Sequence, residues 1–167
     1  GGRLSASTSV VLVRQIGSAL AAAHERGVIH RDIKPHNVFI LEQSQGYPLF
    51  VKVLDFGIAK ILGDAELPGA GHTLTQTGSI IGSPPYMSPE QIEGSKHVDL
   101  RSDLWSLGVI VYESLTGQTP FRGNSFVAVG AAVLAGKYRP VTELRRGLPP
   151  AIDDWFAKAL CLDPGGR

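Results

Sequence analysis

The chain has 167 residues, of which 43% are hydrophobic and 19% charged, enough apolar material for one domain with a buried core. Its net charge of +1 argues against a dedicated nucleic-acid or acidic-membrane surface, because either would need a clear excess of basic residues. The single cysteine, Cys161, excludes an internal disulfide framework and fits a reducing, cytoplasmic compartment. No apolar run approaches the length of a membrane span, so we expect no membrane segment in this chain.

Apolar residues at helical spacing predict a first helix that is capped by Ser7 or Ser9 and runs to about Arg26, with Gly27 as its stop. Residues 28–30 are expected to form a short strand or an extended entry. Two apolar segments, 38–41 and 50–54, flank a turn-rich connector and predict a β-hairpin.

Helical periodicity disappears between residues 63 and 85, which are rich in Gly, Pro, Ser and Thr. A long irregular loop within a compact domain is usually functional or disordered. A helical turn is then expected to open at Pro89, followed by an apolar core helix at about 99–116 and by helices at 125–135 and 152–162. The sequence therefore predicts a mainly α fold with one small β-hairpin.

The segment HRDIKPHN, residues 30–37, crowds ionisable side chains between two apolar segments. A carboxylate held in such a loop, Asp32, can orient a substrate hydroxyl and accept its proton. Lys34 can place positive charge near a transferring phosphoryl group. Asn37 offers a neutral oxygen, which is a hard ligand suited to Mg²⁺.

The motif DFG follows the second β segment and supplies another carboxylate, Asp55, then a bulky Phe56 and a permissive Gly57. We expect Asp55 to meet Asp32 and Asn37 in one pocket at the mouth of the hairpin. Each motif alone has a plainer interpretation, as a turn, a surface charge cluster or an amide that satisfies backbone groups. These plainer interpretations do not account for the order, the spacing and the flanking strands together.

HRDIKPHN followed by DFG resembles the catalytic and metal-binding loops of eukaryotic-type (Hanks-type) serine/threonine protein kinases, in a bacterial style. GSPPYMSPE resembles the end of the activation segment (55–90), with Ser88 where that family usually has Ala. RSDLWSLGVIVYESLTGQTPF resembles the central helix and the turn after it, and LDPGGR resembles a late signature that ends in Arg. The resemblance covers residues 1–167 and implies the C-terminal lobe of the α+β protein-kinase fold.

The resemblance implies ATP and Mg²⁺ as cofactors. Asp32 would be the catalytic base or hydroxyl-orienting acid, and Lys34 would contact the γ-phosphate. Asn37 and Asp55 would bind Mg²⁺, and Phe39 would lie beneath the adenine ring.

Other implied roles are structural. His30 and Phe56 would stack in a hydrophobic column, and Asp103 would accept backbone N–H groups of the catalytic loop. Asp103 could also be an N-cap of the apolar helix, which is compatible with that role. Glu90 would form a buried ion pair with Arg167.

The remaining implied roles are regulatory or concern substrate choice. Arg31 would pair with a phosphorylated activation-segment residue, for which Thr73, Thr75 and Thr77 are the candidates. Ser83 would form hydrogen bonds toward the catalytic aspartate and lysine and favour Ser/Thr substrates.

No G-x-G-x-x-G loop, clamping strand lysine or partner glutamate precedes HRDIKPHN in this sequence. In the family these come from the N-terminal lobe, which we expect to be absent from the chain, so that the isolated chain would be inactive. Bacterial relatives often carry a membrane anchor outside the kinase domain, so the full-length protein could be anchored in this way.

Three functions are compatible with the motifs: a kinase that phosphorylates Ser/Thr of a protein substrate, a pseudokinase or scaffold, and a small-molecule phosphotransferase. The presence of Asp32, Asn37 and Asp55 together favours the protein kinase.

Overall fold

The structure, a computed structural model, describes residues 2–41, 49–56, 84–95 and 98–167. Over these ranges it is mainly helical and contains one two-stranded antiparallel sheet, as the sequence predicts. The α-helices and strands are α1 (Ala6–His24), β1 (Val38–Leu41), β2 (Phe50–Val53), α3 (Pro89–Ile92), α4 (Arg101–Thr116), α5 (Phe126–Ala135), α6 (Val141–Leu144) and α7 (Ala151–Ala159). Short 3₁₀ turns are η1 (Pro35–Asn37), η2 (Pro84–Tyr86) and η3 (Pro164–Gly166).

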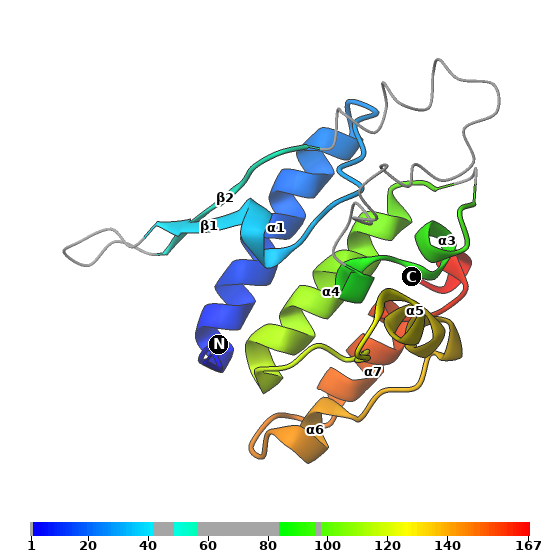
Figure 1. The fold of residues 1–167 in the computed structure, drawn as a ribbon. Coiled ribbons are helices and arrows are strands. Elements are labelled where there is room, and N and C mark those ends of the chain that lie inside the picture. The colour runs from blue at the N-terminus through cyan, green and yellow to red at the C-terminus, as the bar shows by residue number, and fades with distance from the viewer. Residues whose placement is uncertain (1, 42–48, 57–83, 96–97) are drawn as a thin grey trace.

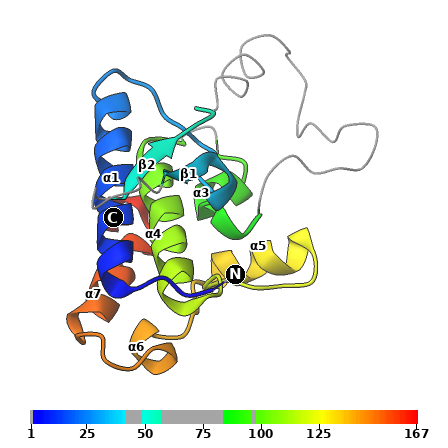
Figure 2. The ribbon, with the colours of Figure 1, turned by 90° about the vertical axis from the view of Figure 1, so that its left-hand side faces the viewer.

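Helix α4 is the centre of the fold. In Figure 1, α1 lies on one side of it, and α5 and α7 lie on the other. Figure 2, turned by 90°, again places α4 between α1 and α5. The helix ends at Thr116, as the sequence predicts, and its C-cap is Gly117, whose φ of 78° suits glycine. Leu100 occupies its N-cap, so the alternative of Asp103 as N-cap is wrong.

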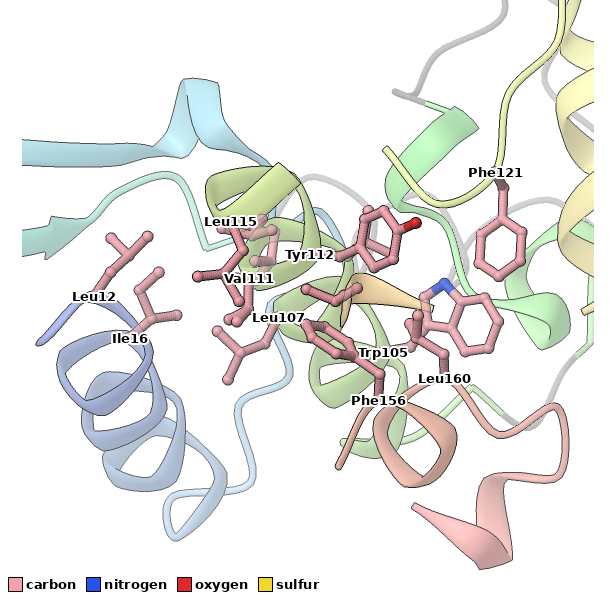
Figure 3. Close-up of a cluster of buried hydrophobic side chains, with 14 of the residues drawn as sticks. Leu12, Ile16, Trp105, Leu107, Val111, Tyr112, Leu115, Phe121, Phe156 and Leu160 are labelled. Atoms are coloured by element: carbon pink, nitrogen blue, oxygen red, sulfur yellow. The ribbon is translucent and has the colours of Figure 1, made fainter. Parts of the chain in front are cut away.

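The core forms on both sides of α4, because this helix is apolar around most of its surface. Figure 3 shows Leu12 and Ile16 of α1 facing α4. On the other side, the ring of Trp105 stacks on that of Phe121 at a centroid distance of 5.4 Å. Burying a large apolar side chain contributes roughly 1.5–3 kcal/mol, so this double-sided packing fixes the position of α4.

Helix α1 begins earlier than predicted. Ser5 is its N-cap and accepts a hydrogen bond from the backbone N–H of Thr8 at 3.0 Å, so the prediction of Ser7 or Ser9 is wrong. Ser9 lies inside the helix, where Ser114 of α4 donates a hydrogen bond to its hydroxyl at 3.0 Å. Ser9 therefore contributes to the packing of α1 against α4 rather than to the cap.

By length and composition, α1 is also long and apolar enough to cross a membrane. In the fold, its buried stripe of Leu12, Ile16 and Leu20 packs against α4. The expectation that no apolar run approaches the length of a membrane span is therefore wrong for α1, of which 22% of the apolar stretch is buried in the fold.

The hairpin forms with the register Val38↔Val53 to Leu41↔Phe50. Residues 28–30 form neither a strand nor a helix and lead into the segment 30–37. The side chains of Phe39, Ile40 and Phe50 are exposed on the hairpin, while Val51 is buried.

The C-terminal part differs from the predicted boundaries. Helix α7 ends at Ala159 rather than near residue 162, and α6 was not predicted. The first backbone N–H groups of α6, from Val141 and Thr142, donate to the carboxylate of Asp153 on α7 at 2.8 and 3.3 Å. A four-residue helix has few bonds of its own, so α6 depends on this acceptor from a later helix.

Candidate active site

The segment 30–37 is fixed to α4 through Asp103. This carboxylate is fully buried, and its two oxygens accept the backbone N–H groups of His30 at 2.9 Å and Arg31 at 2.8 Å. The ring Nε2 of His24, at the end of α1, lies 2.7 Å from the same carboxylate. The contact from Asp103 to the loop backbone that the family resemblance implies is therefore present.

Two non-glycine residues among those described have a positive φ: Arg31 at 63° and Asp55 at 55°. This left-handed conformation costs roughly 1–2 kcal/mol for a residue with a side chain. At Arg31 the surroundings hold the conformation, since Asp103 binds its N–H and Gln91 donates to its carbonyl oxygen at 2.8 Å. Such strain is typical of functional segments.

Asp32, Lys34 and Asn37 lie together. Lys34 Nζ is 2.8 Å from Asp32 Oδ2, and both side chains are partly exposed. The buried Asn37 donates through Nδ2 to the carbonyl oxygen of Asp32 at 2.9 Å. The backbone oxygen of Asn37 accepts the N–H of Leu54 at 2.9 Å, which ties the loop to the residue just before Asp55. Asp32 and Asn37 therefore lie at the end of the hairpin where Leu54 precedes Asp55.

The donor set at this end of the hairpin fits Mg²⁺. The Nδ2 hydrogen bond of Asn37 leaves its Oδ1 as the oxygen available to a metal, and the residue Asp55 is exposed at the end of β2. Mg²⁺ is usually held by one or two carboxylates together with water and phosphate oxygens. No group of three or more His, Cys, Asp or Glu that could hold a metal occurs in the described part of the chain, so an all-protein cage is not formed there.

His30 and Phe56 are in contact, with ring centroids 4.7 Å apart. His30 is fully buried, and its Nε2 lies 2.9 Å from the carbonyl oxygen of Leu54. Phe39, the residue expected beneath adenine, lies on β1 with half of its surface exposed. An exposed aromatic face on a strand can pack against a flat ring.

Several predicted residues of the activation segment lie outside the described residues. These are Gly57, Thr73, Thr75, Thr77 and Ser83.

The end of that segment is described, and Ser88 caps α3 there. Its backbone N–H donates to Gln91 Oε1 at 3.0 Å, and its hydroxyl donates to Ser102 at 3.1 Å. The serine that departs from the family pattern is therefore buried with hydrogen-bond partners.

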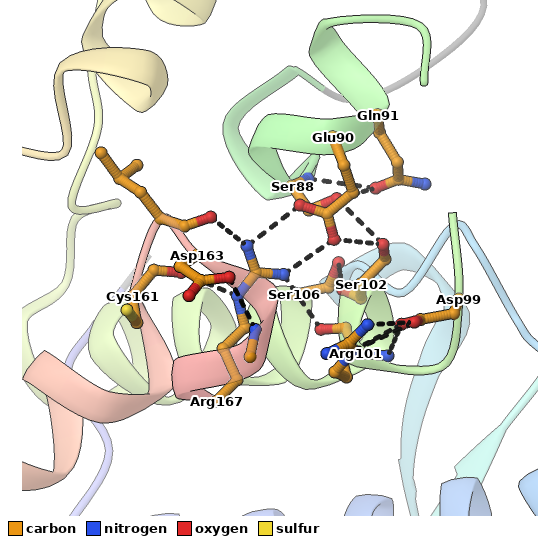
Figure 4. A network of polar contacts seen from close by, with 12 residues as sticks. Ser88, Glu90, Gln91, Asp99, Arg101, Ser102, Ser106, Cys161, Asp163 and Arg167 are labelled. Atoms are coloured by element: carbon orange, nitrogen blue, oxygen red, sulfur yellow. Dashed lines mark hydrogen bonds and ion pairs between the residues drawn. The ribbon is translucent and has the colours of Figure 1, made fainter. Parts of the chain in front are cut away.

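Glu90 and Arg167 form the predicted ion pair, shown in Figure 4. Arg167 donates to the two carboxylate oxygens at 2.8 and 3.0 Å, and its guanidinium lies over the ring of Trp105 at 4.9 Å. Burial alone would raise the pKa of Glu90, but hydrogen bonds from Arg167 and Ser102 outweigh it and lower the pKa.

Sequence reasoning missed the residues that support these motifs. His24 binds Asp103, and Gln91 binds the backbone of Arg31. Tyr86 donates to Glu113 at 2.6 Å, and burial raises the pKa of this tyrosine, so the phenol stays a donor. Their partners are distant in sequence, and no local pattern marks them.

Comparison with known proteins agrees with the motifs. The model of the family described as "Protein kinase domain" matches residues 2–167. The chain is 44% identical over 160 residues to serine/threonine-protein kinase pkn3 of Myxococcus xanthus, which covers 95% of this chain and 28% of that protein. It is 41% identical over 167 residues to serine/threonine-protein kinase Pkn1 of the same organism, covering 100% of this chain and 23% of that protein.

A third relative is serine/threonine-protein kinase PknB of Mycobacterium tuberculosis, 37% identical over 166 residues, covering 99% of this chain and 25% of that protein. The chain thus spans about a quarter of the length of these curated relatives.

Proposed function

Because the chain belongs to the protein kinase domain family, we propose that it is the part of a serine/threonine protein kinase that holds the catalytic loop and the metal-binding residues. The reaction is transfer of the γ-phosphoryl group of ATP to a Ser or Thr hydroxyl of a protein substrate. The observation that carries the proposal is the set of contacts joining Asp32, Lys34 and Asn37 beside the strand that leads to Asp55. The names of the relatives support the same reaction class.

In this proposal, Asp32 orients the substrate hydroxyl and accepts its proton. As the hydroxyl oxygen bonds to the γ-phosphorus, the bond from phosphorus to the bridging oxygen breaks and ADP leaves. Lys34 lies 2.8 Å from Asp32 Oδ2, so its charge acts in the same small volume and stabilises negative charge on the transferring group. Protein groups act here mainly by positioning and charge.

Asn37 and Asp55 would hold Mg²⁺ through their side-chain oxygens. The bound ion supplies positive charge beside the phosphate oxygens. Phe39 would support the adenine ring from β1, where half of its surface is exposed.

The test is Asp32→Asn in the intact protein, measured as transfer of labelled phosphate from ATP to Ser- and Thr-containing peptides. We expect the rate to fall by about 10²–10⁴-fold, because the proton acceptor is lost. The thermal midpoint should stay close to wild type, since the Asp32 side chain is partly exposed.

The matched control is Asp154→Asn, an exposed carboxylate in the first turn of α7. It should retain the wild-type rate. An unchanged rate in Asp32→Asn would reject the proposed role. A wild-type protein that binds partners without transferring phosphate would favour the scaffold alternative.

The proposal extends to regulation and context. Arg31 pairs with a phosphate on Thr73, Thr75 or Thr77, and Ser83 favours Ser/Thr substrates.

The 167 residues alone transfer no phosphate at a useful rate, because their sequence contains no glycine-rich phosphate loop before residue 30 and this reaction depends on positioning. The site works in the cytoplasm, which the single cysteine supports.

A further inference from the structure

Gln15, a half-buried residue of α1, contacts the start of β2 with both ends of its side-chain amide. Its Nε2 donates to the carbonyl oxygen of Leu49 at 2.6 Å. Its Oε1 accepts the backbone N–H of Val51 at 2.7 Å. The bond to Leu49 is slightly shorter than the usual range of about 2.7–3.2 Å and the bond from Val51 lies at its lower limit, so the amide is closely seated.

These two backbone groups belong to the edge of β2 that faces away from β1. Along a strand, the backbone groups of alternate residues point to opposite sides. The N–H of Leu54 points to the β1 side, where the carbonyl oxygen of Asn37 accepts it at 2.9 Å. Leu49 and Val51 have the opposite parity and bond to α1 instead. The amide of Gln15 therefore occupies the place that a third strand would take.

This contact matters because the sheet has two strands, and a two-stranded hairpin is marginally stable in water without further packing. The same strand leads directly to Asp55. Its far end is tied to the catalytic loop through Asn37 and His30, both of which contact the backbone of Leu54. Its near end is tied to α1 through Gln15, and Val51 is buried at that point.

We propose that Gln15 is a positioning residue, which clamps the free edge of β2 and so sets the place of Asp55 relative to Asp32 and Asn37. This inference rests on the proposed function, because it assigns Gln15 a role in the metal-dependent site. It predicts that loss of the clamp weakens binding of Mg²⁺ and ATP without loosening the helical core.

Two variants separate the parts of the clamp. Gln15→Met keeps the length of the side chain and removes both hydrogen bonds. Gln15→Glu keeps an acceptor for the N–H of Val51, but its ionised carboxylate cannot donate to Leu49 and faces that carbonyl oxygen. When protonated, the same carboxyl has one donor and one acceptor, as the amide does. The folded protein therefore favours the protonated form, so the clamp is restored as the pH falls and lost as it rises.

The experiment measures amide hydrogen exchange and Mg²⁺-dependent ATP affinity in the intact protein. In Gln15→Met we expect the amide of Val51 to exchange about tenfold faster, as loss of roughly 1–1.5 kcal/mol of hydrogen bonding implies. The affinity should fall about tenfold, the lower end of what supporting residues of metal ligands contribute. Exchange in α4 should not change. Arg14→Met, an exposed neighbour on α1, is the matched control and should change neither quantity.

In Gln15→Glu, both quantities should approach wild type as the pH is lowered, whereas Gln15→Met should show no such recovery. Unchanged exchange at Val51 in Gln15→Met would show that the clamp does not hold the strand. Faster exchange with unchanged affinity would show a purely structural role and overturn the proposal. Failure of the wild-type protein to bind ATP would reject the proposed function, and with it the positioning role of Gln15. Exchange of the Val51 amide would still show whether Gln15 holds the strand.

Discussion

Asp103 shows how one side chain can organise a loop. Its carboxylate is fully buried and binds the backbone N–H groups of two successive residues, His30 and Arg31, as well as the ring of His24. An ionised carboxylate is only an acceptor, so it can receive all three donors at once. The left-handed conformation of Arg31 persists because these bonds offset its cost.

We expect Asp103→Asn to destabilise the protein by about 1–3 kcal/mol. The new side-chain NH₂ group is a donor in the place of one carboxylate oxygen, so it faces a donor and the acceptor that this donor needs is lost. The measurement is urea unfolding. Asp154→Asn, on the exposed face of α7, should stay within about 0.5 kcal/mol of wild type. Equal stabilities for the two variants would contradict the anchoring role of Asp103.

Among individual residues, sequence motifs identified the candidate site residues but few of the residues that support them. Asp32, Asn37 and Asp55 could be proposed because their order and spacing form a local pattern. Gln15 and His24 could not, since each looks like an ordinary polar residue on an amphipathic helix. Their partners, Val51 and Asp103, are 36 and 79 residues away in the chain.

Among the elements, the helices differ in how closely they approach their neighbours. At Gly108 of α4, an added Cβ would meet the side chains of Ala159 and Leu160 at 3.2 Å. At Gly17 of α1, an added Cβ would meet nothing within 4 Å. Gly108 thus lets α7 pack closely against α4, and an added Cβ there would require its neighbours to shift by a few tenths of an ångström.

These two glycines give a matched prediction. Gly17→Ala should stabilise the protein by about 0.5–1 kcal/mol, because alanine is the better helix former and the site is open. Gly108→Ala should stabilise the protein less than Gly17→Ala does, because the side chains of Ala159 and Leu160 must shift. Gly108→Leu should destabilise the protein by about 1–3 kcal/mol through overpacking. Thermal unfolding measures all three, and equal gains for the two alanine variants would contradict the close approach of α7.

Apolar patterning predicted α1, the hairpin, α4, α5 and α7. A helical repeat indicated α1, two apolar segments around a turn-rich connector indicated the hairpin, and a helix apolar around most of its surface indicated α4. Patterning failed where an element depends on another element. Ser5 caps α1, whereas Ser9 packs against α4, and α6 forms where Asp153 supplies an acceptor. Neither contact between helices leaves a periodic signal in the sequence.

Across the whole molecule, the ion pair between Glu90 and Arg167 ties the end of the activation segment to the last described residue. Both side chains are largely buried, and Ser102 of α4 donates to the same carboxylate. Removing one partner of such a pair leaves the other charge buried and typically costs about 3–5 kcal/mol.

This pair makes stability depend on pH. The pKa of Glu90 is lower in the folded state than in the unfolded chain, so its contribution is full above the unfolded pKa and is lost as the pH falls through the folded value. Glu90→Gln should therefore be about 3–5 kcal/mol less stable than wild type near neutral pH, with a smaller difference in acid. Urea unfolding of both proteins between pH 7 and about 3 measures this difference in stability. The pH range spans the ordinary Glu pKa of about 4.3. The exposed Glu93→Gln is the control, and a difference that does not shrink in acid would contradict the assignment.

The attachment of the catalytic loop to Asp103 also has a consequence for biosynthesis. Its hydrogen-bond acceptor is encoded 72 and 73 residues downstream of the loop amides that it binds. At a translation rate of about 5–20 residues per second, the acceptor follows the loop out of the ribosome by about 4–15 s. During that interval Asp103 is not yet available to the nascent loop, so in a ribosome-bound chain residues 30 and 31 can form these hydrogen bonds only after α4 has emerged.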